Sequence, residues 1–472
     1  MISNQEFFAV NKVLYELIRD SRFRGYTYYS GSCLRDLWLK RGIKSIDLSV
    51  NLPFGATILS NFLTARCGCY VKDKNPIFSH KYGMAQFTLG EKIPALKNIV
   101  FNVSTTSKSK KYDKDGLAPY EVMGSVLEDA HNKDFTINSM YMYVQEELKY
   151  RDVVGMSFGD FEKRLIRTTV DPDMSFGEDP LRMLRAIRYA SELGFGIEKH
   201  TWFGICKNAK SILTISDERI QPELNKILVS PYADEAFRKL YYSGLLTYVL
   251  PEIKDLAGIE QGAQHNENAF EHSLSVMMKM KPSIDHRLAG LLHDVGKPMT
   301  KSTDFYGKIQ FKKHEIIGGD VANILLELLG YPKNIVDNVT QAIKLHTRFK
   351  NVKKTPSKHN VHKFMKESEK YDMDLCLELI DADNNCHQEG HCKPEQVEQI
   401  RKMIAKLTEK AESNKIKLPI NGKDIMKNFG IKKGPRIGKA IDLLKEYSYI
   451  SPKMTKDEAL SVISDAIKRE QI

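Results

Sequence analysis

YYSGSCLRDLWLKRGIKSIDLSV, residues 28–50, is the stretch that decides the fold of the amino-terminal part of the chain. A short apolar segment ends in the turn Gly31-Ser32, and a segment with helical periodicity follows. Apolar and polar residues then alternate from Ile46 to Val50. Period-2 alternation predicts a strand, whereas apolar residues three and four positions apart predict a helix. The stretch therefore predicts a strand, a tight turn, a helix and a second strand in succession.

The remainder of the first 150 residues continues this pattern. We expect strands at 26–30, 46–50, 69–71, 85–89 and 99–103, and helices at 34–39 and 56–65. The lysine-rich segment 107–116 combines like charges with glycine, which predicts a mobile loop. Beyond residue 179 almost every segment has helical periodicity, as at 181–193 and 318–329. The sequence thus predicts an α+β protein with a small α/β head followed by a helical body.

Length and composition restrict the class of protein. A chain of 472 residues is expected to form two to four domains. Lys and Arg number 71 against 60 Asp and Glu, and the resulting formal charge of +11 favours a polyanionic partner. We find neither an apolar run of about 18 residues nor a secretion signal, so we expect a cytoplasmic protein without a membrane partner. The 7 cysteines are spaced irregularly, which does not indicate a disulfide framework.

The turn at residues 31–32 has the chemistry of an anion site. Backbone N–H groups at Gly31 and Ser32, together with the N-terminus of the following helix, can hold a triphosphate. Arg35, one turn into that helix, can add a charge-assisted contact to the same anion. A Gly-Ser turn by itself is more often only a turn, so other residues have to decide between the two interpretations.

A second polar constellation lies in the segment 177–195. Asp179, Arg182 and Arg185 recur every three residues, which keeps them close on one helical face, with Glu178 and Arg188 beside them. Physical chemistry alone favours a capped helix with internal ion pairs.

The middle of the chain carries histidines and aspartates that point to a metal site. An adjacent His293-Asp294 pair follows an apolar run, and burying such groups costs several kcal/mol unless a partner or a metal compensates. Further candidates are spread over the region, namely His272, His314, His346, Asp381 and Asp383. Several convergent histidines are harder to explain as core residues than a single one.

The amino-terminal motifs resemble the class II CCA-adding tRNA nucleotidyltransferase and poly(A) polymerase family. This resemblance implies a polymerase-β-like head in which two alternating strand carboxylates hold Mg²⁺, and these positions fall on Ser45 and Asp47. A third acidic position falls on Asn102. Asp47 is therefore the expected catalytic residue and metal ligand of the head. The resemblance also implies a nucleotide-binding set of Gly31, Ser32, Arg35, Asp134, Asn138, Asp179, Arg182 and Arg185, in which Asp179 and Arg182 read the base of CTP or ATP.

The central motif resembles the HD phosphohydrolase superfamily. By this resemblance the metal ligands are His272, His293, Asp294 and Asp383, with Asp381 in reserve, while His314 and His346 hold a second metal, bind substrate or are structural. His293, Asp294 and Lys297 are the expected catalytic residues. Imidazole and carboxylate ligands suit Mg²⁺, Mn²⁺, Ni²⁺ or Co²⁺. Such domains in the family are associated with 2′,3′-cyclic phosphodiesterase, 2′-nucleotidase and phosphatase activities.

The resemblance implies a division into five parts. They are a head at 1–150, a neck at 151–215, a body at 216–258, an HD domain at 259–395 and a helical tail at 396–472. In the tail, Lys432, Lys433 and Arg436 lie near a helix N-terminus and are expected to contact the tRNA backbone.

We therefore expect a tRNA 3′-end processing or repair protein in which the HD phosphohydrolase is the better-preserved activity. Nucleotidyl transfer is expected to be slow or absent, because carboxylate positions fall on Ser45 and Asn102. Two alternatives stay open. One is a fully active CCA-adding enzyme that uses CTP and ATP, with Glu178, Asp134 or a shifted geometry supplying the missing ligands. The other is a non-catalytic tRNA-binding protein. The sequence does not indicate the oligomeric state.

Overall fold

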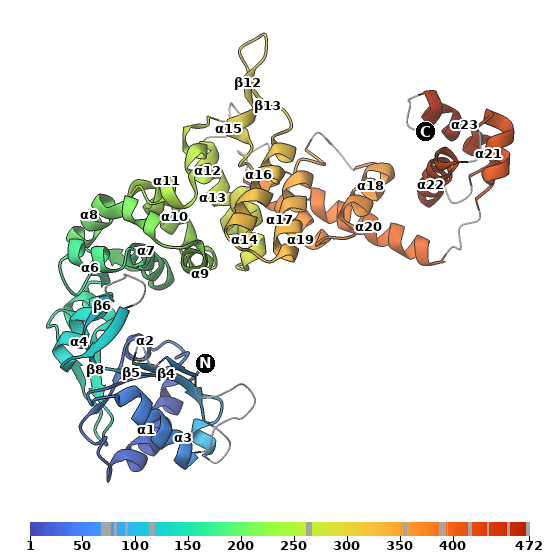
Figure 1. The fold of residues 1–472 in the computed structure, drawn as a ribbon. Coiled ribbons are helices and arrows are strands. Elements are labelled where there is room, and N and C mark those ends of the chain that lie inside the picture. Colours follow the sequence, from blue (N-terminus) through green and yellow to red (C-terminus); the bar gives the residue numbers. More distant parts are fainter. Residues whose placement is uncertain are drawn as a thin grey trace. The chain divides into compact units, whose positions relative to one another are not determined.

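The computed structural model describes residues 1–67, 77–79, 83–89, 93–112, 119–260, 267–350, 352, 356–386, 393, 395–413, 418–431, 434–450 and 454–468. The chain divides into two compact units, Met1–Val249 and Leu250–Ile472. The first unit contains a mixed sheet and the second is mostly helical (Figure 1). The predicted α+β class is confirmed. The finer division predicted at residues 150, 215, 258 and 395 stays a prediction.

A seven-stranded sheet organises the first unit, in the order β3-β4-β5-β2-β1-β8-β9. Strands β2 and β5 run parallel, and the other neighbours are antiparallel. The strands are β1 (Thr27–Ser30), β2 (Ile46–Val50), β3 (Ile77–Ser79), β4 (Met84–Thr88), β5 (Val100–Thr105), β8 (Met140–Tyr143) and β9 (Tyr150–Asp152). The helices of this part are α1 (Asn4–Ile18), α2 (Ser32–Trp38), α3 (Gly55–Cys67) and α4 (Val126–Asn132), with 3-10 turns η3 (Pro94–Leu96) and η4 (Thr136–Asn138). The strand predicted at 69–71 lies outside the described residues.

Alternation along β2 separates an apolar face from a polar one. Ile46, Leu48 and Val50 are buried, and α3 packs on this strand. Side chains at odd positions lie on the opposite face, because successive residues of a strand point to opposite sides. Parallel pairing of β2 with β5 places Asp47 directly beside Asn102. The polar face of β2 is therefore the place where the predicted head site forms.

The lysine-rich segment differs from its prediction. Strand β6 (Ser107–Tyr112) pairs antiparallel with β7 (Pro119–Met123), so the loop predicted over 107–116 was wrong for its first half. The beginning of β6 is anchored, since Ser107 N–H donates to Asp129 Oδ1 at 3.1 Å and Asn132 Nδ2 donates to the Ser107 carbonyl at 2.7 Å. A partner strand and these anchors outweigh the like charges that suggested a loop. Residues 113–118 lie outside the described residues.

Helix α7 (Leu181–Leu193) has the bounds that the sequence predicts and ends at Gly194, whose φ of 67° favours glycine. It packs against α9 (Asp217–Leu228) and α10 (Ala233–Tyr242). The other elements of this part are α5 (Ser157–Glu162), β10 (Leu165–Ile166), α6 (Pro172–Glu178), β11 (Gly196–Ile197), α8 (Lys199–Asn208), η5 (Ala209–Thr214) and α11 (Leu246–Val249).

The second unit is built mainly from helices. They are α12 (Pro251–Asp255), α13 (Ala269–Lys279), α14 (Ile284–Leu292), α15 (Lys297–Thr300), α16 (His314–Leu328), α17 (Lys333–Leu345), α18 (Lys358–Ser368), α19 (Met373–Asn384), α20 (Gln396–Ser413), α21 (Gly422–Phe429), α22 (Pro435–Ile450) and α23 (Lys456–Lys468), with the 3-10 turn η6 (Leu256–Gly258). A two-stranded hairpin of β12 (Lys301–Thr303) and β13 (Ile309–Phe311) interrupts this pattern. The last three helices share a core that includes Ile425, Leu444 and Ile463. Among the described helices, none has the length and apolar character that a bilayer span needs.

Candidate functional site

The polar face of β2 gathers the three positions where the resemblance places carboxylates. Asp47 Oδ1 accepts hydrogen bonds from Ser45 Oγ at 3.0 Å and from Asn102 Nδ2 at 2.8 Å. Its Oδ2 accepts from Ser32 Oγ at 2.5 Å and from the Cys33 N–H at 3.3 Å. One carboxylate that already accepts four hydrogen bonds is a poor ligand set for two cations, since Mg²⁺ demands near-octahedral oxygen ligation. These three positions, with one carboxylate among them, do not by themselves fit a two-ion centre.

Gly31 holds the turn between β1 and α2 in a conformation with φ 66° and ψ −140°. Only glycine adopts this region readily. A Cβ placed there would also lie 3.5 Å from Asp47 Oδ2. The turn therefore brings the start of α2 directly against the one carboxylate of the cluster.

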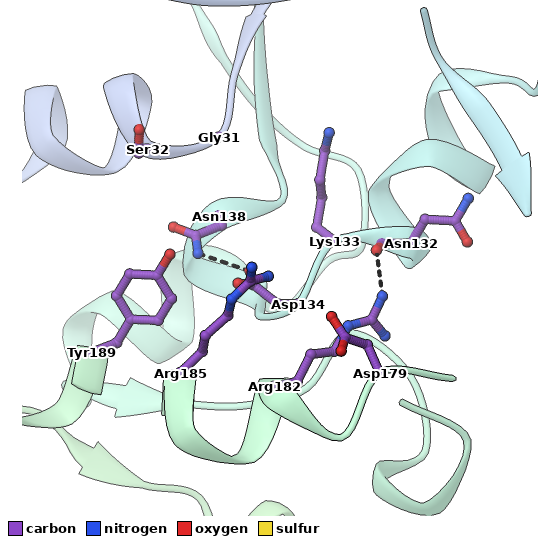
Figure 2. A pocket seen from close by; sticks show the side chains of 10 residues that line it. All are labelled: Gly31, Ser32, Asn132, Lys133, Asp134, Asn138, Asp179, Arg182, Arg185 and Tyr189. Atoms are coloured by element: carbon purple, nitrogen blue, oxygen red, sulfur yellow. Dashed lines mark hydrogen bonds between the residues drawn. The ribbon is translucent and has the colours of Figure 1, made fainter. Parts of the chain in front are cut away.

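A pocket of about 260 Å³ lies beside this turn (Figure 2). Its lining contains every predicted nucleotide-binding residue except Arg35, and adds three residues that the sequence did not single out for this role. The lining residues are Gly31, Ser32, Asn132, Lys133, Asp134, Asn138, Asp179, Arg182, Arg185 and Tyr189. The structure thus brings together the phosphate-binding turn, the segment 132–138 and one face of α7.

Arg35 is not among the residues that line the pocket. Its guanidinium donates to Asp36 Oδ1 and Oδ2 at 2.9 and 3.1 Å and to Asn138 Oδ1 at 3.1 Å. Asn138 Nδ2 in turn donates to Asp134 Oδ1 at 2.9 Å. Arg35 therefore orients the Asn138 amide, which orients Asp134, and the predicted direct contact of Arg35 with an anion stays a prediction.

The two residues expected to read a base both have partners. Asp179 Oδ1 and Oδ2 lie 3.1 and 3.2 Å from Arg219 Nη2, a partner that sequence reasoning missed. Arg182 is buried, donates to the Asn132 carbonyl at 3.1 Å (Figure 2), and pairs with Glu178 at 2.8 Å. Glu178, which the alternative of an active enzyme invokes as a missing ligand, is thus engaged in an ion pair.

Arg185 extends the positive side of the pocket. Burial opposes its charge, but Asp134 and Glu223 raise the pKa of the Arg185 guanidinium above its usual value. Its Nε lies 3.5 Å from Glu223 Oε1. The pocket therefore keeps one cation close to the carboxylate of Asp134.

Six side chains converge in the second unit and form two groups of three. His272, His293 and Asp383 make one group, and Asp294, His314 and His346 make the other. All six are buried. Asp294 links the groups, since its carboxylate oxygens lie 3.1 Å from His293 Nε2 and 3.5 Å from His314 Nε2. The structure thus brings the four predicted HD ligands together with His314 and His346.

Helix ends orient the imidazoles of this cluster. His293 and His346 follow the last residues of α14 and α17, and His314 begins α16. Each ring donates from Nδ1 to the carbonyl three residues earlier, at Gly290, Phe311 and Ile343, over 2.9, 2.7 and 2.6 Å. A hydrogen bond at Nδ1 fixes the tautomer that leaves Nε2 as the electron-pair donor.

The Nε2 atoms show that this set fits a metal. Those of His293, His314 and His346 are buried, and the described residues give them no hydrogen-bond partner. Buried polar atoms without partners are rare in folded proteins. Three orphaned imidazole nitrogens aimed at carboxylates match the ligand set of a divalent cation.

Electrostatics favour the ionisation state that a metal needs at two of these side chains, Asp294 and His346. Burial opposes the charge on Asp294, but His293 and Lys297 hold the pKa of its carboxyl well below the usual range. Burial, together with the neighbouring His293 and His314, lowers the pKa of His346 to about 3. Asp294 is therefore an anion and His346 a neutral ligand.

The structure also separates Asp383 from Asp381. Asp383 Oδ1 lies 3.0 Å from His272 Nε2, whereas Asp381 accepts a hydrogen bond from Asn385 and is not among the six converging side chains. Lys297 is buried, and its Nζ lies 2.5 Å from Asp294 Oδ2. The predicted catalytic residues His293, Asp294 and Lys297 thus lie together.

The predicted RNA-binding residues of the tail are only partly described. Arg436 is exposed in the first turn of α22. Lys432 and Lys433 lie outside the described residues, so the basic cluster stays a prediction.

Family models match three parts of the chain. Residues 27–167 match the poly A polymerase head domain, 194–256 the probable RNA and SrmB-binding site of polymerase A, and 269–384 the HD domain. The CC-adding tRNA nucleotidyltransferase of Thermus thermophilus is 29% identical over 354 residues, which is 71% of this chain and 76% of that protein. Over these ranges the chain is similar to the CCA-adding tRNA nucleotidyltransferase and poly(A) polymerase family, followed by a match to the HD domain.

A second curated relative and a solved structure show the same similarity. The A-adding tRNA nucleotidyltransferase of Deinococcus radiodurans is 27% identical, and the match covers 71% of this chain and 78% of that protein. The fold is similar to the crystal structure of the Bacillus stearothermophilus CCA-adding enzyme in complex with CTP. The TM-score is 0.61 at 21% identity, and the match covers 99% of this chain and 98% of that chain. The family resemblance inferred from the sequence is confirmed.

Proposed function

We propose that this protein processes the 3′ ends of tRNA with its HD site as the working catalytic centre, and that nucleotidyl transfer by its head is slow or absent. The observation that carries the proposal is the contrast between the two sites. The HD cluster offers six buried ligand atoms, three of them imidazole nitrogens without a hydrogen-bond partner among the described residues. In the head, the three positions where the resemblance places carboxylates hold only Asp47, which already accepts four hydrogen bonds.

Six ligands are enough for one or two divalent ions in the HD site. His272, His293 and Asp383 would hold one ion and His314 and His346 a second, with Asp294 touching both groups. Mixed imidazole and carboxylate ligands suit Mg²⁺, Mn²⁺, Ni²⁺ or Co²⁺. A divalent ion bound there supplies Lewis-acid polarisation of a phosphoryl oxygen and an activated water. Lys297, beside Asp294, supplies a buried cation that can offset phosphate charge.

The substrate class that suits this set is a phosphate ester at an RNA 3′ end, either a 2′,3′-cyclic phosphate or a terminal monoester. The relatives act on tRNA, as their names state. A formal charge of +11 supports a polyanionic substrate. In this proposal the head pocket binds a nucleoside triphosphate or the terminal nucleotide of a tRNA. Its lining includes the Gly31-Ser32 turn, Asp179 and the arginines of α7.

The pocket also supports the alternative of an active CCA-adding enzyme. Asp134 and Arg185 line it together with the predicted base-reading residues. In that case CTP and ATP would be substrates and the single Asp47 carboxylate would suffice.

End-labelled tRNA distinguishes these functions. With tRNA lacking CCA, Mg²⁺, CTP and ATP, we expect no extension above background. With tRNA ending in a 2′,3′-cyclic phosphate and Mn²⁺ or Ni²⁺, we expect the phosphate to be hydrolysed, and EDTA to stop this reaction. Rapid incorporation of CTP and ATP would contradict the proposal and favour the CCA-adding alternative.

Replacing Arg219 with alanine tests whether Asp179 recognises the base of a bound nucleotide. The Asp179–Arg219 pair is partly exposed, and such pairs contribute about 1 kcal/mol or less. Freeing the carboxylate should therefore tighten CTP or ATP binding by roughly fivefold, measured by isothermal titration calorimetry. Arg238→Ala, which removes the partner of Asp234 on α10, is the matched control and should leave nucleotide affinity unchanged. Weaker binding by Arg219→Ala would mean that Arg219 itself contacts the nucleotide.

A further inference from the structure

The hairpin β12–β13 has no part in the proposed function so far. It connects α15 to α16 and projects away from the neighbouring helices (Figure 1). Its tip carries Phe305 and Tyr306, whose side chains are 97% and 91% exposed. Their ring centroids lie 5.5 Å apart with the planes at 88°. Two bare aromatic rings at the end of a projecting hairpin are an unusual surface for a protein in water, since exposed apolar groups favour association.

The turn that presents these rings is well defined. Asp304 Oδ1 accepts the N–H groups of Tyr306 and Lys308, both at 2.9 Å, and its Oδ2 accepts from Gln310 Nε2 at 3.0 Å. These donors lower the pKa of the Asp304 carboxyl, with the Lys308 N–H as the largest cause. Gly307 takes a positive φ of 76°. The rings are therefore held outward by a structured turn, and the one carboxylate of the hairpin is used inside it.

The hairpin as a whole is basic, with Lys308 next to the tip and the other lysines at the base. Residues 301–313 contain four exposed lysines, at 301, 308, 312 and 313, and one acidic residue, Asp304. Four cations and one anion leave a net charge of +3 on this short segment. Aromatic rings on which bases stack, combined with lysines that neutralise phosphates, are the features by which proteins hold single-stranded nucleic acid.

The base of the hairpin is tied to the metal-ligand cluster. Phe311, the last residue of β13, accepts a hydrogen bond from His314 Nδ1 on its carbonyl, and its ring centroid lies 5.5 Å from Lys297 Nζ. Gly296 makes the close approach on the other side, where a Cβ would lie only 2.3 Å from the His314 carbonyl oxygen. The hairpin is therefore connected at its base to the segments that carry Asp294, Lys297 and His314. Because of this connection, we favour the RNA substrate of the HD site, and not a lipid surface, as the ligand of the hairpin tip.

We propose that Phe305 and Tyr306 form a stacking platform for unpaired bases of single-stranded RNA, and that the hairpin lysines contact the adjoining phosphates. The inference deepens the proposed function, since it rests on an RNA end as the substrate of the HD site. In this inference the hairpin binds the single-stranded RNA, and the HD site hydrolyses its terminal phosphate.

The test compares the full-length protein with the double variant Phe305→Ala/Tyr306→Ala. Fluorescence anisotropy with a short fluorescein-labelled single-stranded RNA should show affinity reduced by about tenfold or more, the range expected when stacking partners are removed. Hydrolysis of bis-p-nitrophenyl phosphate, which is too small to span to the tip, should be unchanged. Lys308→Gln/Lys313→Gln should reduce the salt dependence of RNA binding. Phe54→Ala, which removes an 81% exposed ring in the first unit, is the matched control.

Three results would overturn the inference. They are equal affinity of the double variant and the wild type, absence of measurable RNA binding by the wild type, and an equal loss on duplex RNA, which offers no unpaired bases. A loss of binding to phosphatidylcholine–phosphatidylglycerol vesicles with RNA affinity unchanged would assign the tip to a lipid surface instead. Failure of the proposed function is distinct from these, because a protein that hydrolyses nothing still allows the RNA affinities to be compared.

Discussion

Replacing Asp294 with asparagine should reduce hydrolysis of bis-p-nitrophenyl phosphate and of 2′,3′-cyclic AMP by at least about a thousandfold, roughly 4 kcal/mol. Asp294 is the side chain that links the two ligand groups, and its oxygens lie close to His293, His314 and Lys297. Asparagine keeps the shape but removes the negative charge that a cation requires. Steady-state rates in the presence of Mn²⁺ or Ni²⁺ provide the measurement, together with metal content by mass spectrometry.

A loss of activity through misfolding has to be separated from a loss of metal. Asparagine at 294 leaves Lys297 buried without its partner carboxylate, and breaking a buried pair commonly costs about 3–5 kcal/mol. His346→Gln is the second variant, because it removes one neutral ligand and no charge. His359→Ala replaces an exposed histidine of the same unit and should behave as wild type. If the Asp294 and His346 variants hydrolysed both substrates as fast as the wild type at normal melting temperature, the HD cluster would not be the catalytic centre. Absence of hydrolysis by the wild type as well would favour the non-catalytic alternative.

The double variant Ser45→Asp/Asn102→Asp should raise incorporation of CTP into tRNA lacking CCA by about a hundredfold, which corresponds to about 3 kcal/mol. Both positions already contact Asp47 within hydrogen-bond distance, at 3.0 and 2.8 Å. Carboxylates there would surround a common centre with three negative charges, the condition under which two Mg²⁺ ions can bind. Single-turnover extension of end-labelled tRNA measures the gain.

Asp47 provides the control for this gain. Adding Asp47→Asn to the double variant should remove the new activity, because the centre then loses the one carboxylate that the natural chain keeps. No gain in the double variant, together with an inactive wild type, would place the cause of the inactivity elsewhere in the head. An active wild type would show that one carboxylate suffices.

Sequence patterns predicted the elements whose signal is local. Helix α7 has its predicted bounds, and the apolar alternation of Ile46, Leu48 and Val50 placed β2 correctly. The pairing of Asp47 with Asn102 also agrees with the position that the family resemblance assigned to each. These features depend on short-range periodicity and on motifs, which a single sequence contains.

Other features depend on contacts that no short window contains. Strand β6 forms because β7 pairs with it, which the lysines in the segment conceal. Arg219 reaches Asp179 from 40 positions away in the sequence. The hydrogen bond from His314 to the Phe311 carbonyl requires the fold of the hairpin that precedes α16. The choice of Asp383 over Asp381 follows from the rotation of α19, since neighbours two positions apart lie on different sides of a helix.

The hydrogen bonds around Asp47 have a consequence for folding. In a head with acids at all three positions, the carboxylates repel one another until cations arrive, so that part of the sheet is held under electrostatic stress. Here an amide and two hydroxyls donate to the single anion instead. The apo head is therefore relieved of that repulsion and should remain rigid at cation concentrations too low to fill such a centre, a gain in robustness obtained at the expense of reactivity.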